Sequence, residues 1–319
     1  MLQLAVERFV YTVLRLPPDA RWAEALAFFL YDSIKIMLLL FGMIAVIGFL
    51  RTYLPQAKIK AWLVERKGTS NLFASLFGAV TPFCSCSSIP LFLSFLKAGI
   101  PLGITFSFLI ASPLINEYLV VLMLGFFGWK ITLAYILSGL VIGTSCGFVL
   151  GKMNLEKHLV EDLFADVAPL SEVEAPQNIR RRIAFGWREA LTIVKKLWMW
   201  ILLGVGIGAL IHNYVPQETI QGIIQRTGFF SVPIATLIGV PMYGSCAAIV
   251  PIAVVLFQKG VPLGTALAFM MAISALSFPE AVMLRRAMKL PLIVIFFGIT
   301  TLGIIFTGYL FNLLQIVLV

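Results

Sequence analysis

The chain has 319 residues, 60% of them hydrophobic and 12% charged, and its mean hydropathy is +0.99. A soluble domain carries about 25% charged residues, so most of the apolar excess must face lipid and a soluble protein is excluded. The net charge of +9 comes from basic residues in the loops between apolar stretches. Such residues orient a protein in the membrane, so no nucleic-acid partner is predicted.

The N-terminal segment, residues 1–21, differs from the apolar stretches that follow it. Residues 1–16 alternate apolar and polar side chains at helical spacing, and Pro17 and Pro18 end the pattern. This pattern predicts a short amphipathic helix at the membrane interface. The segment lacks a charged start, a short apolar run and a small-residue cleavage site, so no removable signal peptide is expected.

Eight apolar stretches follow, and each is long enough to cross a bilayer, which takes about 20 residues. Four stretches precede and four follow a polar segment at 152–188, which we expect to be a cytoplasmic linker. The chain therefore divides into two membrane units, 22–151 and 189–319. The stretches lie at 22–50, 71–96, 101–127, 131–150, 191–211, 229–257, 262–284 and 291–313.

The two membrane units are related in sequence at a constant offset of 161 residues. The run Gly99-Ile-Pro-Leu-Gly103 matches Gly260-Val-Pro-Leu-Gly264. Between residues 53 and 103, 13 of 51 positions are identical, and seven of the 13 are Pro, Gly or Tyr, which chance agreement among apolar residues does not favour. The sequence therefore predicts an internal duplication.

The second stretch of each unit is interrupted at its centre, at 81–88 and at 241–246, by residues that favour non-helical backbone. The loop at 51–67 and the linker are both rich in Lys and Arg, so both should be cytoplasmic and an even number of crossings should separate them. A re-entrant hairpin at 71–96 satisfies this parity. We therefore expect an all-α integral membrane protein with two inverted-topology repeats, each of three transmembrane helices and one re-entrant hairpin. Such proteins build a transport site near the bilayer midplane.

Cysteines mark the candidate substrate site at the two hairpin tips. In an extended backbone, alternate side chains point to the same face, so two thiols at 84 and 86 can close on one centre. Thiolates favour thiophilic cargo such as Cu(I), Zn or trivalent arsenic. The alternative is that these are small buried side chains, as free cysteines commonly are. No resident metal or cofactor is predicted, and the expected substrate-binding residues at the tips are Cys84, Ser85, Cys86, Ser245 and Cys246.

The third stretches are also broken, and each places a carboxyl group deep in an apolar run. The functional interpretation makes Glu117 and Glu280 proton carriers, with Asn116 as a polar lining of the same cavity. The structural alternative is that both carboxylates accept hydrogen bonds from N–H groups freed by the breaks. Cys146 lies among small residues in an unbroken apolar helix and is expected to serve helix packing.

Several of these motifs resemble one family. The runs Thr81-Pro-Phe-Cys-Ser-Cys-Ser-Ser-Ile-Pro90, Ser112-Pro-Leu-Ile-Asn-Glu117 and Gly244-Ser-Cys246 are similar to those of the ArsP/YraQ-type permeases of bacteria and archaea. The resemblance covers essentially the whole transmembrane part and implies a membrane permease. The best-understood branch of that family exports trivalent organoarsenicals, so the resemblance implies this substrate only by similarity.

We therefore expect a multi-pass permease of the cell membrane, embedded in lipid, that exports a small thiophilic molecule with proton coupling and is not an enzyme. Two alternatives stay open: a membrane thiol–disulfide oxidoreductase with a redox partner protein, and a transporter of a metal ion or a sulfur-containing small molecule. The sequence shows no phosphate-binding loop or hydrolase motif. It leaves open whether the chain forms a homodimer.

Overall fold

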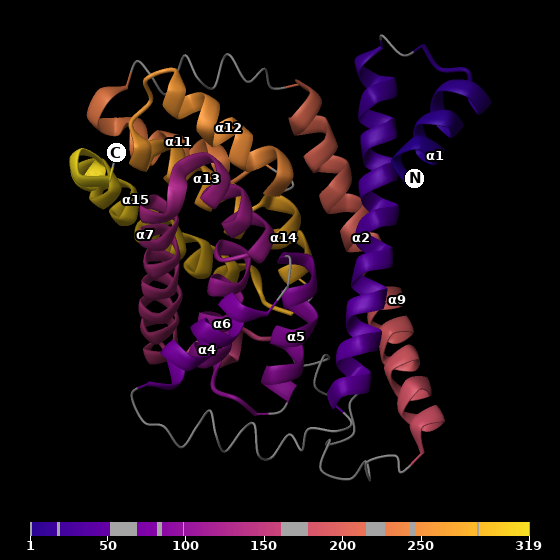
Figure 1. The fold of residues 1–319 in the computed structure, drawn as a ribbon. Helices are drawn as coiled ribbons and strands as arrows, with labels where there is room; N and C mark the ends of the chain where they lie inside the picture. The colour runs from indigo at the N-terminus through magenta and orange to yellow at the C-terminus, as the bar shows by residue number, and fades with distance from the viewer. Residues whose placement is uncertain are drawn as a thin grey trace.

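A computed structural model describes residues 2–17, 20–51, 69–81, 85–97, 99–160, 178–214, 227–242, 246–285 and 287–318. This part of the chain is helical and contains no β-strand (Figure 1). The first half contains α2 (Arg21–Arg51), α4 (Ser70–Val80), α5 (Ser85–Lys97), α6 (Leu102–Leu114) and α7 (Glu117–Lys152). The second half contains α9 (Ile179–Tyr214), α11 (Ser231–Gly239), α12 (Cys246–Gln258), α13 (Leu263–Ala275), α14 (Phe278–Leu284) and α15 (Leu290–Leu318).

Several helices are long and apolar enough to cross a membrane. Three candidate spans are found among the described residues, at Glu117–Lys152, Leu263–Leu284 and Leu290–Gln315. The first is kinked at Gly128, whose φ of 78° lies in the left-handed region that glycine adopts without strain. The part of α7 after this kink is about 36 Å long at 1.5 Å per residue, enough for a hydrocarbon layer of about 30 Å. The chain is therefore a multi-pass membrane protein.

The N-terminal segment is helical from Leu2 to Val13, as α1 (Leu2–Arg8) followed by the single π-helical turn η1 (Phe9–Val13). Val6 and Val10 are buried against Ala27 of α2, whereas Leu4, Phe9 and Val13 are exposed. The segment thus packs one face against α2 and exposes an apolar face on its other side. Its position at the membrane interface stays a prediction.

Helices α2 and α9 pack against each other and run in opposite directions. Gly186 of α9 lies against Ala45 near the end of α2, whereas Gly206 lies against Phe29 nearer its start. Figure 1 shows this pair standing beside the bundle formed by the other long helices. Glycine at 186 allows the two backbones to approach closely, since a Cβ there would lie 3.0 Å from the backbone nitrogen of Phe49.

The two halves repeat the same backbone turn at the predicted offset. Gly99 and Gly260 both have positive φ, 74° and 89°, and the following prolines both cap a helix with ψ near 140°. The N–H of Ile100 donates to the carbonyl of Phe95 at 3.1 Å, and the N–H of Val261 donates to that of Leu256 at 3.0 Å. The matched sequence run therefore encodes the same reversal of the chain twice.

Close helix contacts also recur at this offset. A Cβ added at Gly103 would lie 2.8 Å from the carbonyl oxygen of Gly147, and one added at Gly264 would overlap the carbonyl oxygen of Gly308. These glycines let α6 contact α7 and α13 contact α15 backbone to backbone, as small residues do between membrane helices. The correspondence of 161 residues therefore extends beyond residue 103, to the last helix of each half.

Candidate functional site

The third stretch of each half is broken at the same register. Helix α6 ends at Leu114 and α7 begins at Glu117, while α13 ends at Ala275 and α14 begins at Phe278. The capping residues between them, Asn116 and Ser277, are extended, with ψ of 139° and 149°. The predicted breaks are therefore present, although α7 and α14 resume helical structure after only two residues.

Asn116 has a local structural role at its break. Its side-chain oxygen accepts a hydrogen bond from the backbone N–H of Tyr118 at 3.0 Å, which caps the first turn of α7. Ser277 at the equivalent position has no side-chain capping bond and is buried. The prediction that Asn116 lines a substrate cavity stays a prediction, since capping does not exclude it.

The breaks lie at the ends of the most deeply buried helices. Every residue of α6 and every residue of α13 is buried, and the two helices contact each other. In a membrane protein a helix buried on all sides is enclosed by protein, away from lipid. The unwound segment after α13 is buried at both Leu276 and Ser277, whereas the one after α6 is buried at Ile115 and only partly buried at Asn116.

The two predicted carboxyl groups differ in burial. Glu280 is 0% exposed, in the first turn of α14, which packs against α5 and α9. Glu117 is exposed. At the offset of 161, Glu280 corresponds to the buried Leu119, and Glu117 corresponds to Phe278, which is 38% exposed. The carboxyl groups therefore occupy different sides of their helices and are not equivalent positions of the two halves.

Most predicted cysteine and serine ligands lie where side chains are not described. Cys84 and Ser245 lie outside the described residues, and the side chains of Ser85, Cys86 and Cys246 are not described. The backbone does correct one premise, because α5 begins at Ser85 and Cys86 is therefore helical and not extended. Serine at a helix start favours this, since its hydroxyl can satisfy a free N–H. Because Cys86 is in the helix, the pairing of the two thiols cannot rest on an extended backbone through both cysteines.

Cys146 packs as predicted. It is buried where α7 crosses α15, its Sγ donates to the carbonyl oxygen of Ile299 at 3.7 Å, and it lies 3.1 Å from the position that a Cβ on Gly303 would take. Among the described side chains, no group of three or more His, Cys, Asp or Glu could hold a metal ion.

Sequence reasoning missed a polar contact set between helices. In the first half, Asn71 donates to the hydroxyl of Ser107 at 2.9 Å. In the second half, the side-chain oxygens of Asn312 and Gln315 on α15 accept from the backbone N–H groups of Gly264 at 2.7 Å and Leu263 at 3.0 Å. Helix α13 is therefore capped by side chains of another helix. The only sequence signal for this is Pro262, which precedes the helix and has no side-chain acceptor for its first N–H groups.

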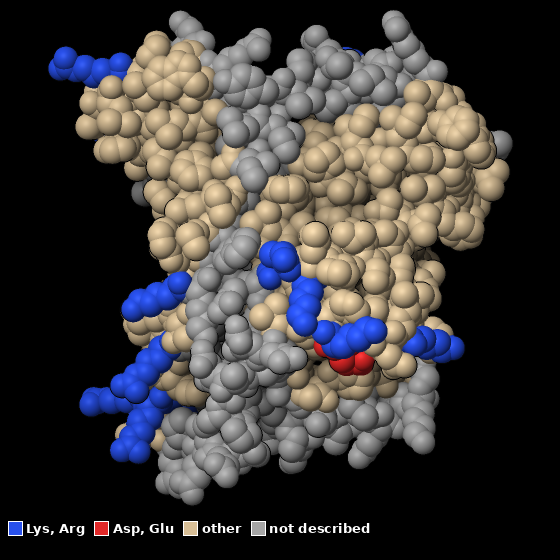
Figure 2. Space-filling view, turned by 180° about the vertical axis from the view of Figure 1, so that it is seen from behind, with Lys and Arg blue, Asp and Glu red and all other residues tan. Residues whose placement is uncertain are grey.

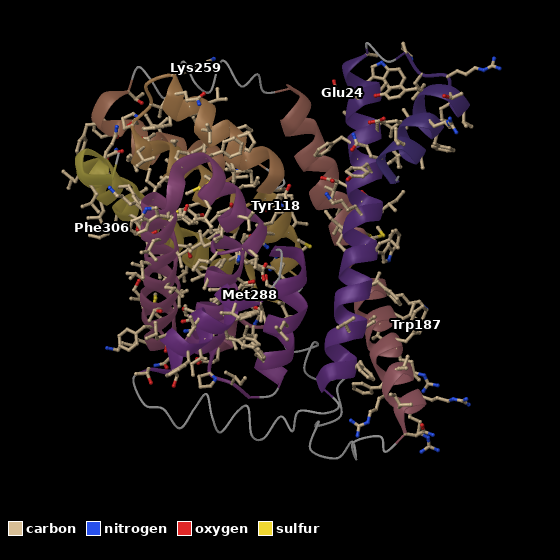
Figure 3. All side chains as sticks on the ribbon, viewed as in Figure 1. Glu24, Tyr118, Trp187, Lys259, Met288 and Phe306 are labelled. Carbon is tan, nitrogen blue, oxygen red and sulfur yellow. The ribbon has the colours of Figure 1, made fainter. Side chains whose placement is uncertain are left out.

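The linker also contacts the second half, which the sequence did not indicate. The backbone N–H of Lys289 donates to the carbonyl of His158 at 2.8 Å, and that of Val160 donates to the carbonyl of Ala287 at 3.0 Å. The start of the linker is thus attached to the turn between α14 and α15. Figure 3 labels Met288, in this turn, in the lower part of the bundle and Lys259 at its top.

Comparison with known proteins finds relatives of this chain in bacteria and archaea. A protein of Bacillus subtilis, the UPF0718 protein YcgR, is 22% identical over 262 residues, which cover 82% of this chain and 88% of the relative. The UPF0718 protein YraQ of Escherichia coli is 25% identical over 250 residues, or 76% of this chain and 69% of the relative.

A third relative carries a more specific name. It is a putative two-component membrane permease complex subunit of Streptococcus mutans, 25% identical over 209 residues, or 63% of this chain and 66% of the relative. No solved structure matches the chain significantly. The profile of the ArsP_1 family, described as a predicted permease, matches residues 21–313, and the chain therefore belongs to this permease family.

Proposed function

We propose that this membrane permease is a secondary transporter that exports a small thiophilic solute, such as a trivalent organoarsenical, through a site near the bilayer midplane. The observation that carries the proposal is the fully buried Glu280, one turn after a helix break and on a helix that packs against α5. An intramembrane carboxyl group is costly and marks an ion or substrate pathway by default.

The arrangement of the helices supports two inverted repeats. Helices α2 and α9, equivalent at the offset of 161, run antiparallel. In Figure 1, α4 and α5 lie in the lower half of the bundle and α11 and α12 in the upper half. These four helices have 9 to 13 residues, so each is at most about 20 Å long and too short to span alone. We propose that each pair is a re-entrant hairpin within membrane units 22–151 and 189–319.

The substrate site would lie between the tips of these hairpins. We propose that Cys84 and Cys86 bind the cargo from one side and Cys246 from the other, with Ser85, Ser245 and Asn116 completing the lining. Contact of α5 with α14 supports this, because α5 begins with Ser85 and Cys86 and α14 carries Glu280. A carboxyl and a soft-ligand site on neighbouring helices can couple proton and cargo.

Glu280 is the proposed proton carrier. Its enclosed position lets it hold a proton in one state of the transporter and release it when the site becomes hydrated in the other. Glu117, which is exposed, is the second carboxyl group that we propose takes part in proton coupling.

The test is uptake of methylarsenite into everted membrane vesicles with an imposed proton gradient. We expect uptake by the native protein, its loss in the Cys84→Ser/Cys86→Ser variant, and retention in the control Cys146→Ser, which changes a cysteine placed in helix packing. No uptake by the native protein would refute the organoarsenical substrate. Full uptake by the double variant would show that the thiols do not bind cargo.

The partner of this chain is a separate point of the proposal. The name of the Streptococcus mutans relative refers to a two-component complex. We propose that this chain acts in the cell membrane either as a homodimer or with a second subunit, and affinity purification after mild cross-linking distinguishes the two. A single band at the monomer mass would contradict both.

A further inference from the structure

The N-terminal third of α9 combines exposed apolar residues with a basic cluster. Ile183, Trp187 and Leu191 are 55%, 55% and 39% exposed and are spaced four residues apart, so they form one stripe along the helix. Arg180, Arg181 and Arg188 are exposed on the same segment. At 100° per residue, these three arginines fall within about 100° of one another: Arg180 lies in line with the stripe, and Arg181 and Arg188 lie to one side of it. Arginine and apolar side chains therefore form one continuous surface, which we call the α9 surface.

The length and packing of α9 place this surface at a membrane boundary. Its 36 residues are about 54 Å long, whereas the hydrocarbon layer is about 30 Å thick, so about 24 Å of the helix lies outside. Gly186 is held against the backbone of Ala45, and the ring of Trp187 meets Phe41 edge-on at 4.7 Å. These contacts fix the position of Trp187 relative to α2 (Figure 3). Tryptophan is a residue type enriched at membrane interfaces.

The charge around the α9 surface has one sign among the described residues. Figure 2, viewed from behind, shows several Lys and Arg side chains at the lower left, where α9 begins, and no described acidic side chain beside them. Among the described side chains, Arg180, Arg181 and Arg188 therefore present positive charge next to an apolar stripe.

We propose that the α9 surface binds an anionic phospholipid, with its phosphate between Arg180, Arg181 and Arg188 and an acyl chain along Ile183, Trp187 and Leu191. Guanidinium groups bind phosphate through two parallel hydrogen bonds. The apolar stripe can contact the acyl chain of a lipid, whereas a soluble anion has no apolar part to bind there. A lipid at this position would stabilise the contact of α9 with α2. The site is independent of the transported cargo.

The experiment uses Trp187 as reporter in vesicles that contain brominated lipids, which quench tryptophan on contact. The chain has six tryptophans, so the quenching of Trp187 is obtained as the difference between each protein and the same protein with Trp187→Phe. We expect brominated phosphatidylglycerol to quench Trp187 at much lower mole fraction than brominated phosphatidylcholine. This preference should fall about fivefold for each arginine replaced by glutamine and vanish in Arg180→Gln/Arg181→Gln/Arg188→Gln, since a basic residue near an anionic surface contributes about 1 kcal/mol.

A matched control removes the same charge elsewhere. Arg8→Gln/Arg15→Gln/Lys130→Gln changes three cations outside the α9 surface and should leave the preference of Trp187 unchanged. Variants with lysine at 180, 181 and 188 should keep part of the preference, which guards against misfolding of the glutamine variant. Equal quenching by the two lipids in the native protein would refute the site. An equal loss in the control would attribute the preference to net charge, and that too would overturn the proposal.

Discussion

Replacing Gly264 by alanine tests the close contact between α13 and α15. A Cβ at this position would overlap the carbonyl oxygen of Gly308 and lie 2.7 Å from the backbone nitrogen of Asn312. Both obstacles are backbone atoms, so no side chain can turn away and α15 must shift. Overpacking of this kind costs about 1–3 kcal/mol. The shift would also lengthen the 2.7 Å hydrogen bond from the N–H of Gly264 to the side chain of Asn312.

The assay is thermal unfolding of the purified protein in detergent. The matched control is Gly298→Ala, in α15, where a Cβ would meet nothing within 4 Å and the gain in helix propensity should stabilise the protein slightly. We expect Gly264→Ala to unfold several degrees below the native protein and the control to unfold at or above it. Gly103→Ala should behave as Gly264→Ala does, because it occupies the equivalent contact with Gly147 and Gly151. Equal transition temperatures for Gly264→Ala and the control would refute the close-contact reasoning.

Three further predictions concern single side chains. Glu280→Gln should reduce gradient-driven uptake at least tenfold, and Glu117→Gln should reduce it less. The reverse order in the vesicle assay would contradict the assignment of the buried carboxyl group as the proton carrier. Asn312→Ala should lower the stability by about 1–2 kcal/mol, because it leaves the N–H of Gly264 without its acceptor in the interior; an unchanged unfolding temperature would count against this cap. Gly260→Ala should cost about 1 kcal/mol, since φ is 89° there, and hydrogen exchange of the N–H of Val261 should rise; unchanged exchange would show that the turn tolerates a Cβ.

Regular features of the fold could be predicted from the sequence, because they follow from hydropathy and from glycine and proline. The apolar stretches became helices, and the two Gly-x-Pro-Leu-Gly runs became equal turns. The breaks at 115–116 and 276–277 lie within the interruptions predicted at 112–117 and 274–280. These features are local, so a short window of sequence contains the physical cause of each.

Other features could not be predicted because their causes are not local. Helix α9 begins at Ile179, within the segment expected to be a linker, because hydropathy does not detect a helix whose first turns carry arginines. The capping of α13 by Asn312 and Gln315 depends on residues about fifty positions away. Glu117 and Glu280 looked alike in sequence, and only the register of α7 and α14 separates the buried carboxyl from the exposed one. For the cysteines at the hairpin tips, the assumption of extended backbone was wrong at Cys86, because its helix starts one residue earlier.

The antiparallel pairing of α2 with α9 has a consequence for how such a protein can arise. At the offset of 161, Gly206 is the counterpart of Ala45, and Gly186 is the counterpart of Ala25, one turn from Phe29. The contact of Gly186 with Ala45 thus has a near-mirror in the contact of Gly206 with Phe29. A contact that is the same from both sides is what two identical chains form about a two-fold axis. Joining two copies of one gene would therefore preserve an existing dimer interface, and the fused chain needs no new surface to hold its halves together.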